Sequence, residues 1–296
     1  MRKIDSVPAI KLLKRDAHKG DRGRMVLVAG SLPMSGAARL AGWGALRSGA
    51  GLVTVATPEV IQPIVASDLP CAMTLPLPSR KGVFTAAGAT AVREATADAF
   101  GIGPGIDTTV APFLRKLLKG LATPVVLDAD ALNVLAAHED LLAELEGPRV
   151  LTPHPGEASR LLGREVPRDA KGRIAAAEEL ADRHHAIVVL KGASTIVTDA
   201  DRYYVNKTGN PGMATGGSGD VLTGVLTTRL AQGADPLDAA IQAVALHGHA
   251  GDLACAAVGE HGMIATDIVG NLPAALSALI ETKPKSQKRT GSRRRG

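Results

Sequence analysis

Short apolar runs of strand length recur along this chain, and segments with helical periodicity separate them. Four of these runs are continuous rather than alternating: residues 25–30, 52–56, 124–128 and 186–190. Continuous runs are typical of strands that are buried on both faces of a parallel sheet. The alternation of strands and helices therefore predicts an α/β fold. Since no linker interrupts the middle of the 296 residues, we expect one domain.

Glycine and polar residues follow nearly every predicted strand. Gly105, Asp128, His154 and Lys191 each come at or soon after the end of one. Because the carboxyl ends of parallel strands meet at one edge of a sheet, we expect these residues to surround a ligand site. The lysine, glycine and hydroxyl residues of segment 191–195 suit a nucleotide phosphate or adenosine pocket.

The segment 210–224 (Asn-Pro-Gly-Met-Ala-Thr-Gly-Gly-Ser-Gly-Asp-Val-Leu-Thr-Gly) is rich in glycine and small hydroxyl residues. Apolar residues with helical spacing follow, so the segment predicts a loop that enters a helix N-terminus. Unpaired N–H groups there attract anions, and those of Gly217, Ser218 and Gly219 are the expected donors. Asp220 stands where the glycines stop. On the motif alone it is either a helix cap or a general base.

Acidic and histidine side chains near other strand ends are further candidates. His154 lies between two prolines, which hold it rigidly, and it is the histidine best placed for a site. Asp128 and Asp130 either cap the next helix or hold a metal through water, and capping is the favoured interpretation. His247 and His249 look weaker, because residues two apart do not share a helix face.

The charge of the chain is concentrated at its end. Seven of the 34 lysines and arginines lie in residues 283–295, where there is no acid, which leaves 27 basic against 29 acidic residues elsewhere. We expect residues 283–296 to be a disordered basic tail. Contact between this tail and nucleic acid is a weaker interpretation than a solubilising role, since no base-reading module accompanies it.

Cellular location is indicated by what the sequence lacks. No run of eighteen apolar residues occurs, so we expect no membrane span, and the N-terminus has no secretory signal pattern. Two distant cysteines, Cys71 and Cys255, make no disulfide framework. These features favour the cytoplasm.

Several local structures are also expected. Residues 1–17 should form a short helix, and residues 70–78, which contain three prolines, an irregular segment. Ser35 should cap a helix that runs to Arg47. Further helices are expected at 58–66, 86–97, 110–119, 169–184, 236–257 and 266–280, and a β-hairpin at 196–205.

Seven motifs together resemble, in order, those of the ADP-dependent NAD(P)H-hydrate dehydratases. They are His18-Lys-Gly-x-x-Gly23, Ser35-Gly-Ala-Ala38, Gly103-Pro-Gly105, Leu127-Asp-Ala-Asp-Ala-Leu-Asn133, Leu151-Thr-Pro-His-Pro-Gly-Glu157, Leu190-Lys-Gly-Ala-Ser-Thr195 and Gly216-Gly-Ser-Gly-Asp220. The resemblance covers about residues 10–280. It implies a three-layer, ribokinase-like α/β fold with a mostly parallel central sheet and helices on both faces. This domain would span residues 1–282.

The resemblance also implies a reaction. Such enzymes are hydro-lyases that return the S form of hydrated NADH or NADPH to NADH or NADPH, with cleavage of ADP to AMP and phosphate. Asp220 would be the catalytic base, and Ala38, Gly105 and His154 would join it in contacting the hydrated dinucleotide. The adenine nucleotide would contact Lys191, Gly192, Ala193, Ser194, Thr195 and Gly219.

Further properties follow from the same resemblance. Mg²⁺ is expected as a cofactor, with Asp128 and Glu157 as the first ligands to test, although the sequence does not assign them. The partners would be the hydrated dinucleotide and ADP or ATP. A homo-oligomer, with a tetramer favoured, is also implied.

Two other functions compete with this one. The first is a kinase of the same fold that phosphorylates a sugar or a thiazole alcohol with the same Asp220. It would need a small enclosed acceptor pocket instead of an open groove. The second is a non-catalytic nucleotide sensor, which an intact Gly-Gly-Ser-Gly-Asp motif disfavours, because a sensor need not keep a base.

Overall fold

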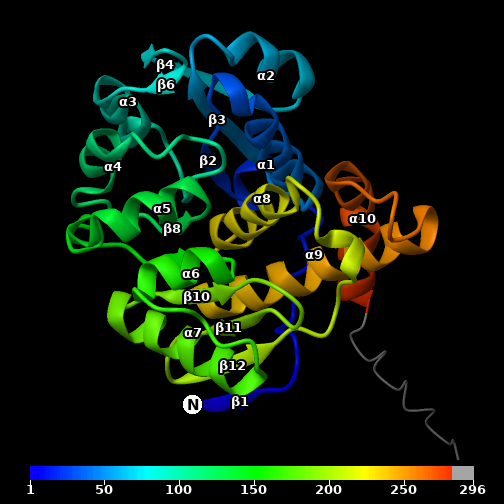
Figure 1. The fold of residues 1–296 in the computed structure, drawn as a ribbon. Helices are drawn as coiled ribbons and strands as arrows, with labels where there is room; N and C mark the ends of the chain where they lie inside the picture. Colours follow the sequence, from blue (N-terminus) through cyan, green and yellow to red (C-terminus); the bar gives the residue numbers. More distant parts are fainter. Residues whose placement is uncertain (282–296) are drawn as a thin grey trace, which may run out of the picture.

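The computed structural model describes residues 1–281, and the strands of this part of the chain form one large sheet and one small hairpin (Figure 1). The strands of the large sheet are β1 (Arg2–Ile4), β2 (Arg24–Val28), β3 (Leu52–Pro58), β4 (Met73–Leu77), β7 (Ala99–Ile102), β8 (Val125–Leu127), β9 (Arg149–Leu151), β10 (Ile187–Leu190), β11 (Ile196–Thr198) and β12 (Arg202–Val205). The hairpin pairs β5 (Ser79–Arg80) with β6 (Val83–Phe84).

The large sheet is mostly parallel. Its order is β1-β12-β11-β10-β9-β8-β7-β2-β3-β4, and the seven strands from β10 to β4 all run in the same direction. Only β11 is antiparallel to its neighbours β10 and β12, which confirms the predicted hairpin at 196–205. The carboxyl ends of the seven parallel strands therefore share one edge.

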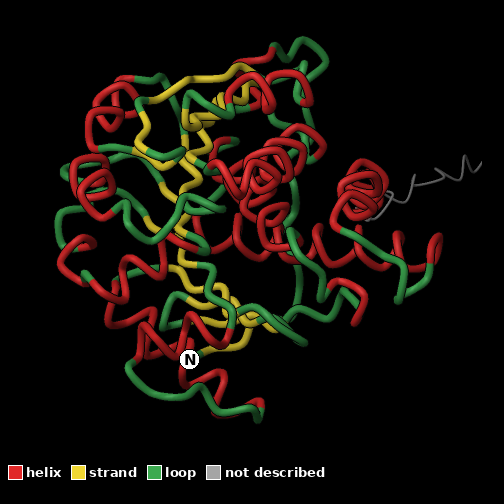
Figure 2. Tube along the Cα trace, turned by 45° about the horizontal axis from the view of Figure 1, so that its top comes forward, coloured by secondary structure: helices red, strands yellow, loops and turns green. Residues whose placement is uncertain are grey.

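Helices cover both faces of this sheet (Figure 2). One face carries α1 (Ser35–Arg47), α2 (Gln62–Asp68), α8 (Ser218–Ala231), α9 (Pro236–Val258) and α10 (Ala265–Glu281). The other carries α3 (Ala89–Glu94), α4 (Ala111–Leu118), α5 (Asp130–Ala137), α6 (Pro155–Leu162) and α7 (Ala170–His184). This confirms the expected three-layer α/β fold.

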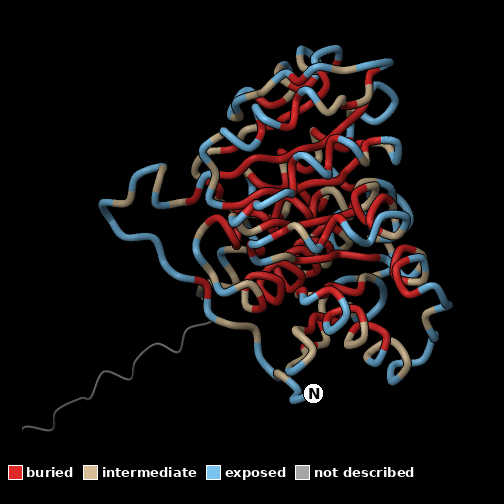
Figure 3. Tube along the Cα trace, turned by 90° about the vertical axis from the view of Figure 1, so that its left-hand side faces the viewer, coloured by how far each residue is buried: buried red, intermediate tan, exposed pale blue. Residues whose placement is uncertain are grey.

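Alternation along the strands builds a separate core on each face. On β2, Met25 and Leu27 pack into the first core, while Val26 and Val28 pack into the second. Both cores are largely aliphatic, and the buried residues follow the sheet and the inner helix faces (Figure 3). Every residue of β2 beyond its first is thus buried, as expected of a strand covered on both faces.

Two glycines fix the position of α8 against α1. A Cβ on Gly44 would lie 2.5 Å from the carbonyl oxygen of Val221, and one on Gly224 would lie 2.1 Å from that of Ala41. The two backbones therefore approach more closely than any side chain permits. This contact sets where the N-terminus of α8 emerges at the carboxyl edge of the sheet.

Two of the predicted local structures are wrong. No helix forms within residues 1–17; instead β1 pairs with β12, with Arg2 opposite Arg202, and Pro8 follows where a helix would need an N–H donor. The segment 70–78 is not irregular, because it contains β4, which pairs with β3. Pro76 is tolerated in this strand because β4 lies at the edge of the sheet.

Other predictions need smaller corrections. Met34 is the N-cap of α1, and Ser35 is its first residue and makes no capping hydrogen bond. The helix expected at 58–66 starts only at Gln62, since β3 continues to Pro58. Cys71 and Cys255 are free thiols.

Two further expectations concern a membrane span and the C-terminal tail. No helix in residues 1–281 is long and apolar enough to cross a membrane. The predicted basic tail, residues 283–296, lies outside the described residues.

Candidate active site

A cavity of about 810 Å³ opens at the carboxyl edge of β8, β9 and β10. Five stretches of chain line it: residues 128–129, residues 154 and 157, residues 191–195, the loop at 206–215 with the start of α8, and α9 at residues 244–248. The first three are the ends of parallel strands that the sequence singled out. The cavity therefore brings together Asp128, His154, Lys191 and Asp220, which are far apart in sequence.

The glycine-rich segment enters α8 as expected, but the helix starts earlier than the motif suggested. Gly217 is the N-cap, with φ +89°, and a Cβ there would lie 2.3 Å from Cδ1 of Leu40. Ser218 is the first helical residue, so Asp220 lies inside the first turn and is not the cap. Only glycine suits position 217, both for its left-handed backbone and for the close approach of α1.

Unpaired backbone donors face outward from this helix start. The N–H groups of Gly219 and Asp220 make no hydrogen bond to any residue in 1–281, while that of Ser218 lies 3.4 Å from the carbonyl of Thr215. Free N–H groups and the positive end of the helix dipole favour an anion. The N–H of Gly217 is likewise unpaired within residues 1–281, so the anion hole expected at Gly217–Gly219 stays a prediction, and Asp220 offers a further donor.

Asp220 has an unusual proton affinity. Burial raises the pKa of its carboxyl to about 7; repulsion from Asp128 and Asp130 adds to the rise, and attraction by Lys191 opposes it. No hydrogen bond to its side chain forms within residues 1–281. A carboxylate with a pKa near neutrality, lining a cavity, has the properties of a general base.

Lys191 and Asp128 form the charged centre of the cavity. The Lys191 ammonium donates to Oδ1 of Asp128 at 2.7 Å, and the hydroxyl of Thr223 donates to Oδ2 at 2.7 Å. Asp128 is only 1% exposed. Burial lowers the pKa of Lys191, but the attraction of Asp128, Glu157 and Asp220 outweighs it and raises the pKa overall. Lys191 therefore stays a cation beside the start of α8.

His154 and Glu157 close the next side of the cavity through reciprocal capping of α6. Nδ1 of His154 accepts from the N–H of Gly156 at 3.0 Å, and Oε2 of Glu157 accepts from the N–H of His154 at 2.8 Å. The same Glu157 oxygen lies 3.8 Å from the Lys191 ammonium. With Nδ1 occupied as an acceptor, Nε2 of His154 is the nitrogen left to carry a proton.

The capping role favoured for Asp128 and Asp130 is wrong. Ala129, with φ +51°, is the N-cap of α5, and no side chain caps this helix. Asp128 binds Lys191 and Thr223 instead, and Asp130 accepts from the N–H of Asp107 at 2.9 Å. A left-handed alanine is strained backbone, and such strain is concentrated at functional sites.

Sequence reasoning missed or underrated several residues that line the cavity. Nε2 of His247 lies 3.5 Å from the hydroxyl of Ser218, and burial lowers the pKa of His247 to about 4, so it is neutral. Asn206 donates to the carbonyls of Thr208 and Val244 and so ties the loop after β12 to α9. Asn206 follows a strand end, which is the same signal that identified the other residues.

Three predicted site residues do not line the cavity. Ala38 is fully buried, and Gly217 lies against Leu40. A Cβ on Gly105 would lie 2.7 Å from Cβ of Met34, so this glycine packs against the segment that precedes α1. Contacts of these residues with a dinucleotide remain predictions.

Fold and site together define an α/β protein with a nucleotide-sized cavity at the carboxyl ends of its parallel strands. Its structure is similar to that of a ribokinase-like superfamily protein from Enterococcus faecalis, with 26% identity, a TM-score of 0.78, and coverage of 94% of this chain and 96% of that one. The fold is therefore ribokinase-like. A family model described as NAD(P)H-hydrate dehydratase matches residues 25–274. The chain belongs to the NAD(P)H-hydrate dehydratase family, a family of hydro-lyases.

Individual relatives agree with this family. The bifunctional NAD(P)H-hydrate repair enzyme Nnr of Moorella thermoacetica is 42% identical over 284 residues, which are 92% of this chain and 53% of the relative. The chain thus spans about half the length of that relative. The ADP/ATP-dependent NAD(P)H-hydrate dehydratase of Bacillus subtilis, co-crystallised with ATP and Mg²⁺, is 34% identical with a TM-score of 0.77, covering 92% of this chain and 95% of that one.

Proposed function

We propose that this chain dehydrates the S form of hydrated NADH or NADPH at the expense of ADP, which is cleaved to AMP and phosphate. The observation that carries the proposal is the position of Asp220. Its carboxyl, with a pKa of about 7, lines the cavity in the first turn of α8, beside the unpaired N–H groups of Gly219 and of Asp220 itself. A base and an anion site are thereby adjacent, as a phosphoryl transfer to a hydroxyl needs.

The chemistry follows from the poor leaving ability of hydroxide. Asp220 would take the proton of the ring hydroxyl while the hydroxyl oxygen attacks the terminal phosphorus of ADP and AMP departs. Loss of the phosphate with its bonding electron pair, and of a proton from the neighbouring carbon, would then restore the ring double bond. The N–H groups at the start of α8 would stabilise the charge on the transferring phosphoryl group.

The nucleotide is assigned to the Lys191 side of the cavity. Lys191, held by Asp128, is a fixed cation, and residues 192–195 line the wall beside it. A lysine ammonium binds phosphate as a point charge. The Bacillus subtilis relative crystallised with ATP and Mg²⁺ supports a nucleotide co-substrate. The hydrated nicotinamide would then approach from the His154 side.

The described residues of this site offer few carboxylate ligands for Mg²⁺. Both oxygens of Asp128 already accept hydrogen bonds, whereas Glu157 accepts the N–H of His154 through Oε2 only, and its Oε1 lies 3.4 Å from Nε2 of His154. No group of three His, Cys, Asp or Glu side chains suited to a metal occurs in residues 1–281. Mg²⁺ commonly enters with nucleotide phosphates and uses one or two carboxylates. Bound in that way, beside Glu157 and Asp128, it would neutralise phosphate charge.

Location and assembly complete the proposal. The substrates proposed here are soluble nucleotides, and the two cysteines are free, which supports a cytoplasmic enzyme. A homo-oligomer, with a tetramer favoured, is proposed from the family resemblance.

The decisive experiment incubates the protein with hydrated NADPH and ADP, then with ATP, and follows absorbance at the reduced-nicotinamide band. Recovery of absorbance that requires a nucleotide is the expected result. If neither nucleotide restores the band, the small-molecule kinase becomes the better interpretation, and phosphorylation of sugar and thiazole alcohols would then be measured.

A further inference from the structure

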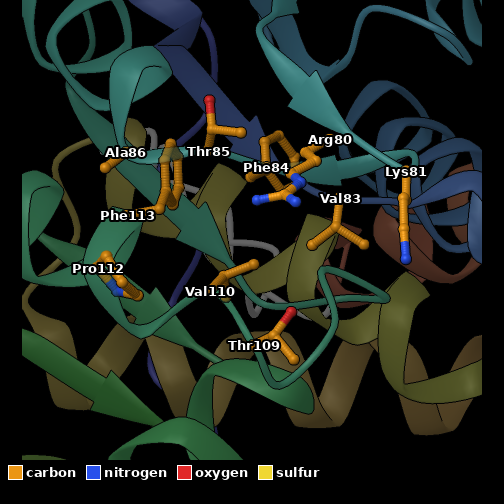
Figure 4. Close-up of a pocket in the computed structure, with 10 residues that line it drawn as sticks. All are labelled: Arg80, Lys81, Val83, Phe84, Thr85, Ala86, Thr109, Val110, Pro112 and Phe113. Atoms are coloured by element: carbon orange, nitrogen blue, oxygen red, sulfur yellow. The ribbon is translucent and has the colours of Figure 1, made fainter.

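A second cavity of about 460 Å³ lies between the β5–β6 hairpin and the start of α4 (Figure 4). It shares no lining residue with the cavity around Asp220. Its apolar wall includes Phe84 and Phe113, whose rings stack with centroids 5.1 Å apart. Arg80 and Lys81, which are exposed, also line it. Ligand pockets commonly span about 300–1,000 Å³, so this one is large enough for a nucleoside monophosphate.

The residues that line this cavity carry only positive charge. No acidic residue lines it, and no carboxylate in residues 1–281 forms an ion pair with Arg80 or Lys81. The nearby carboxylate of Asp107 accepts both the N–H and the hydroxyl of Thr109. Helix α4 also begins here, at Ala111, and its N-cap Val110 makes no side-chain capping bond, so the positive end of the helix adds to the field. The geometry and the charge favour an anionic ligand.

The second cavity flanks the predicted dinucleotide side of the active site. The tip of the hairpin, Gly82, accepts the N–H of Leu32 at 3.0 Å, and a Cβ on Gly82 would lie 2.3 Å from that of Leu32. Two residues further on, Met34 lies against Gly105. The loop of residues 31–34 therefore joins the wall of the second cavity to Gly105, one of the residues expected to contact the substrate.

The first cavity is too small to hold both ADP and a whole hydrated dinucleotide. ADP and a hydrated dinucleotide contain three nucleoside units, while about 810 Å³ lies within the range of one small-molecule pocket. A dinucleotide whose nicotinamide lies at Asp220 must therefore extend over neighbouring surface. The loop of residues 31–34 leads from Gly105 to the basic cavity.

We propose that this second cavity binds the adenosine 2′-phosphate end of hydrated NADPH, with Arg80 and Lys81 as the residues that distinguish it from hydrated NADH. The inference rests on the proposed function, because it assumes a hydrated dinucleotide at Asp220. A 2′-phosphate is the only chemical difference between the two substrates. Unpaired cations beside an apolar wall provide charge-assisted hydrogen bonds to that group and apolar contact to its nucleoside.

The test compares the reaction products NADPH and NADH, titrated into the full chain and followed by nicotinamide fluorescence. The double variant Arg80→Gln, Lys81→Asn removes both charges, and asparagine tolerates the left-handed backbone at position 81, where φ is +55°. Arg93→Gln is the matched control, since Arg93 is exposed on α3, lines neither cavity, and donates only to the carbonyl of Lys116.

We expect the double variant to weaken NADPH binding roughly tenfold and NADH binding less than about twofold. The control should change neither. An unchanged NADPH-to-NADH ratio would overturn the proposal. Equal weakening of both would also overturn it, because the cavity would then recognise a group that the two dinucleotides share.

A second probe separates this inference from the proposed function. Adenosine 2′,5′-bisphosphate should bind the wild-type chain more tightly than 5′-AMP, and the double variant should abolish that preference. If this preference exists but hydrated NADPH is never dehydrated, the proposed function fails while the anion site stands. If dehydration occurs and neither the bisphosphate preference nor the dinucleotide ratio depends on residues 80 and 81, the anion site fails alone.

Discussion

The ammonium of Lys191 lies 2.7 Å from Oδ1 of Asp128, across 63 positions of sequence. This pair joins the ends of β10 and β8 at the point where α8 begins. Asp128 is buried, the Lys191 side chain is 18% exposed, and the second carboxylate oxygen of Asp128 accepts from Thr223 inside α8. One ion pair thus links two strands and the helix that carries Asp220.

Asp220→Asn should remove turnover while leaving the fold and nucleotide binding intact. General-base catalysis contributes about 10²–10⁴-fold, so dehydration of hydrated NADPH should fall by at least about 10²-fold. ADP affinity is measured by calorimetry in the same preparation. The control is Asp238→Asn, which alters a carboxyl on α9 that does not line the cavity. Near-normal dehydration by the Asp220 variant would rule out this residue as the base.

The pH dependence of kcat/KM should report the same carboxyl. Because a base acts only when ionised and the pKa of Asp220 is raised to about 7, activity should increase with pH through neutrality and level off above it. The profile is measured from pH 5.5 to 9 with ADP in excess. A rate that is constant between pH 5.5 and 8 contradicts the assignment.

The contribution of Asp220 to the free energy of unfolding should fall as pH rises, whereas activity should increase. Between the ordinary aspartate pKa of 3.8 and about 7, the folded chain retains a proton on Asp220 that the unfolded chain releases, so this residue lowers stability as pH rises through that window. Asp220→Asn should therefore be more stable than wild type by roughly 1–3 kcal/mol at pH 8, discounted for partial exposure, and similar to it at pH 4. Urea unfolding at both pH values measures the difference. An advantage that is equal at pH 4 and pH 8 would show that ionisation is not its cause.

Asp128→Asn should destabilise the chain more than Thr223→Val does. The first change leaves the largely buried ammonium of Lys191 without its carboxylate, at a cost of about 2–4 kcal/mol, while the second removes one hydrogen bond, worth about 1 kcal/mol. Urea unfolding at pH 7 compares the two. Asp128→Asn should also shift the pH profile to lower pH, because repulsion from Asp128 helps to raise the pKa of Asp220. Equal losses in the two variants would argue against a dominant ion pair.

Gly224→Ala should be strongly destabilising, because its new Cβ would lie 2.1 Å from the carbonyl oxygen of Ala41. We expect a loss of about 3 kcal/mol or more, as for severe overpacking. Gly270→Ala is the control: Gly270 lies inside α10 with no atom within 4 Å of the new Cβ, so the same change should stabilise by about 0.5–1 kcal/mol. Thermal unfolding of the two variants gives the comparison, and a mild effect at position 224 would contradict the close helix contact.

The sequence predicted the parallel sheet because four of its strands are continuous apolar runs, and it predicted the site because polar residues follow the strands. Local patterns failed where pairing with a distant strand decided the structure. Nothing in residues 1–17 shows that Arg2 lies opposite Arg202 in a pair of strands. The prolines in 70–78 argue locally against the edge strand that this segment forms with β3. Tertiary pairing overrode local propensity in both segments.

The same limit applies within the site. Asp128 carries the same signal whether it caps a helix or binds a cation, and only the fold shows that Lys191 reaches it. The pKa of Asp220 likewise depends on burial and on neighbours 92 and 29 positions away, Asp128 and Lys191. The sequence did not single out His247 as a cavity residue, because its contact with the Ser218 hydroxyl joins α9 to α8. The spacing of residues within α9 does not reveal that contact.

The glycine contact between α1 and α8 has a consequence for how the protein can move. Backbones that touch at Gly44 and Gly224 leave no room for α8 to slide or roll, so the carboxylate of Asp220 is carried on a stationary support. Any closure around bound ligands must then come from the surrounding loops. Residues 206–215 are tied to α9 by polar contacts, such as those of Asn206 and Asn210, and by Met213, which packs against the first core. Ligands must therefore adjust to a carboxylate whose position the contact between α1 and α8 fixes.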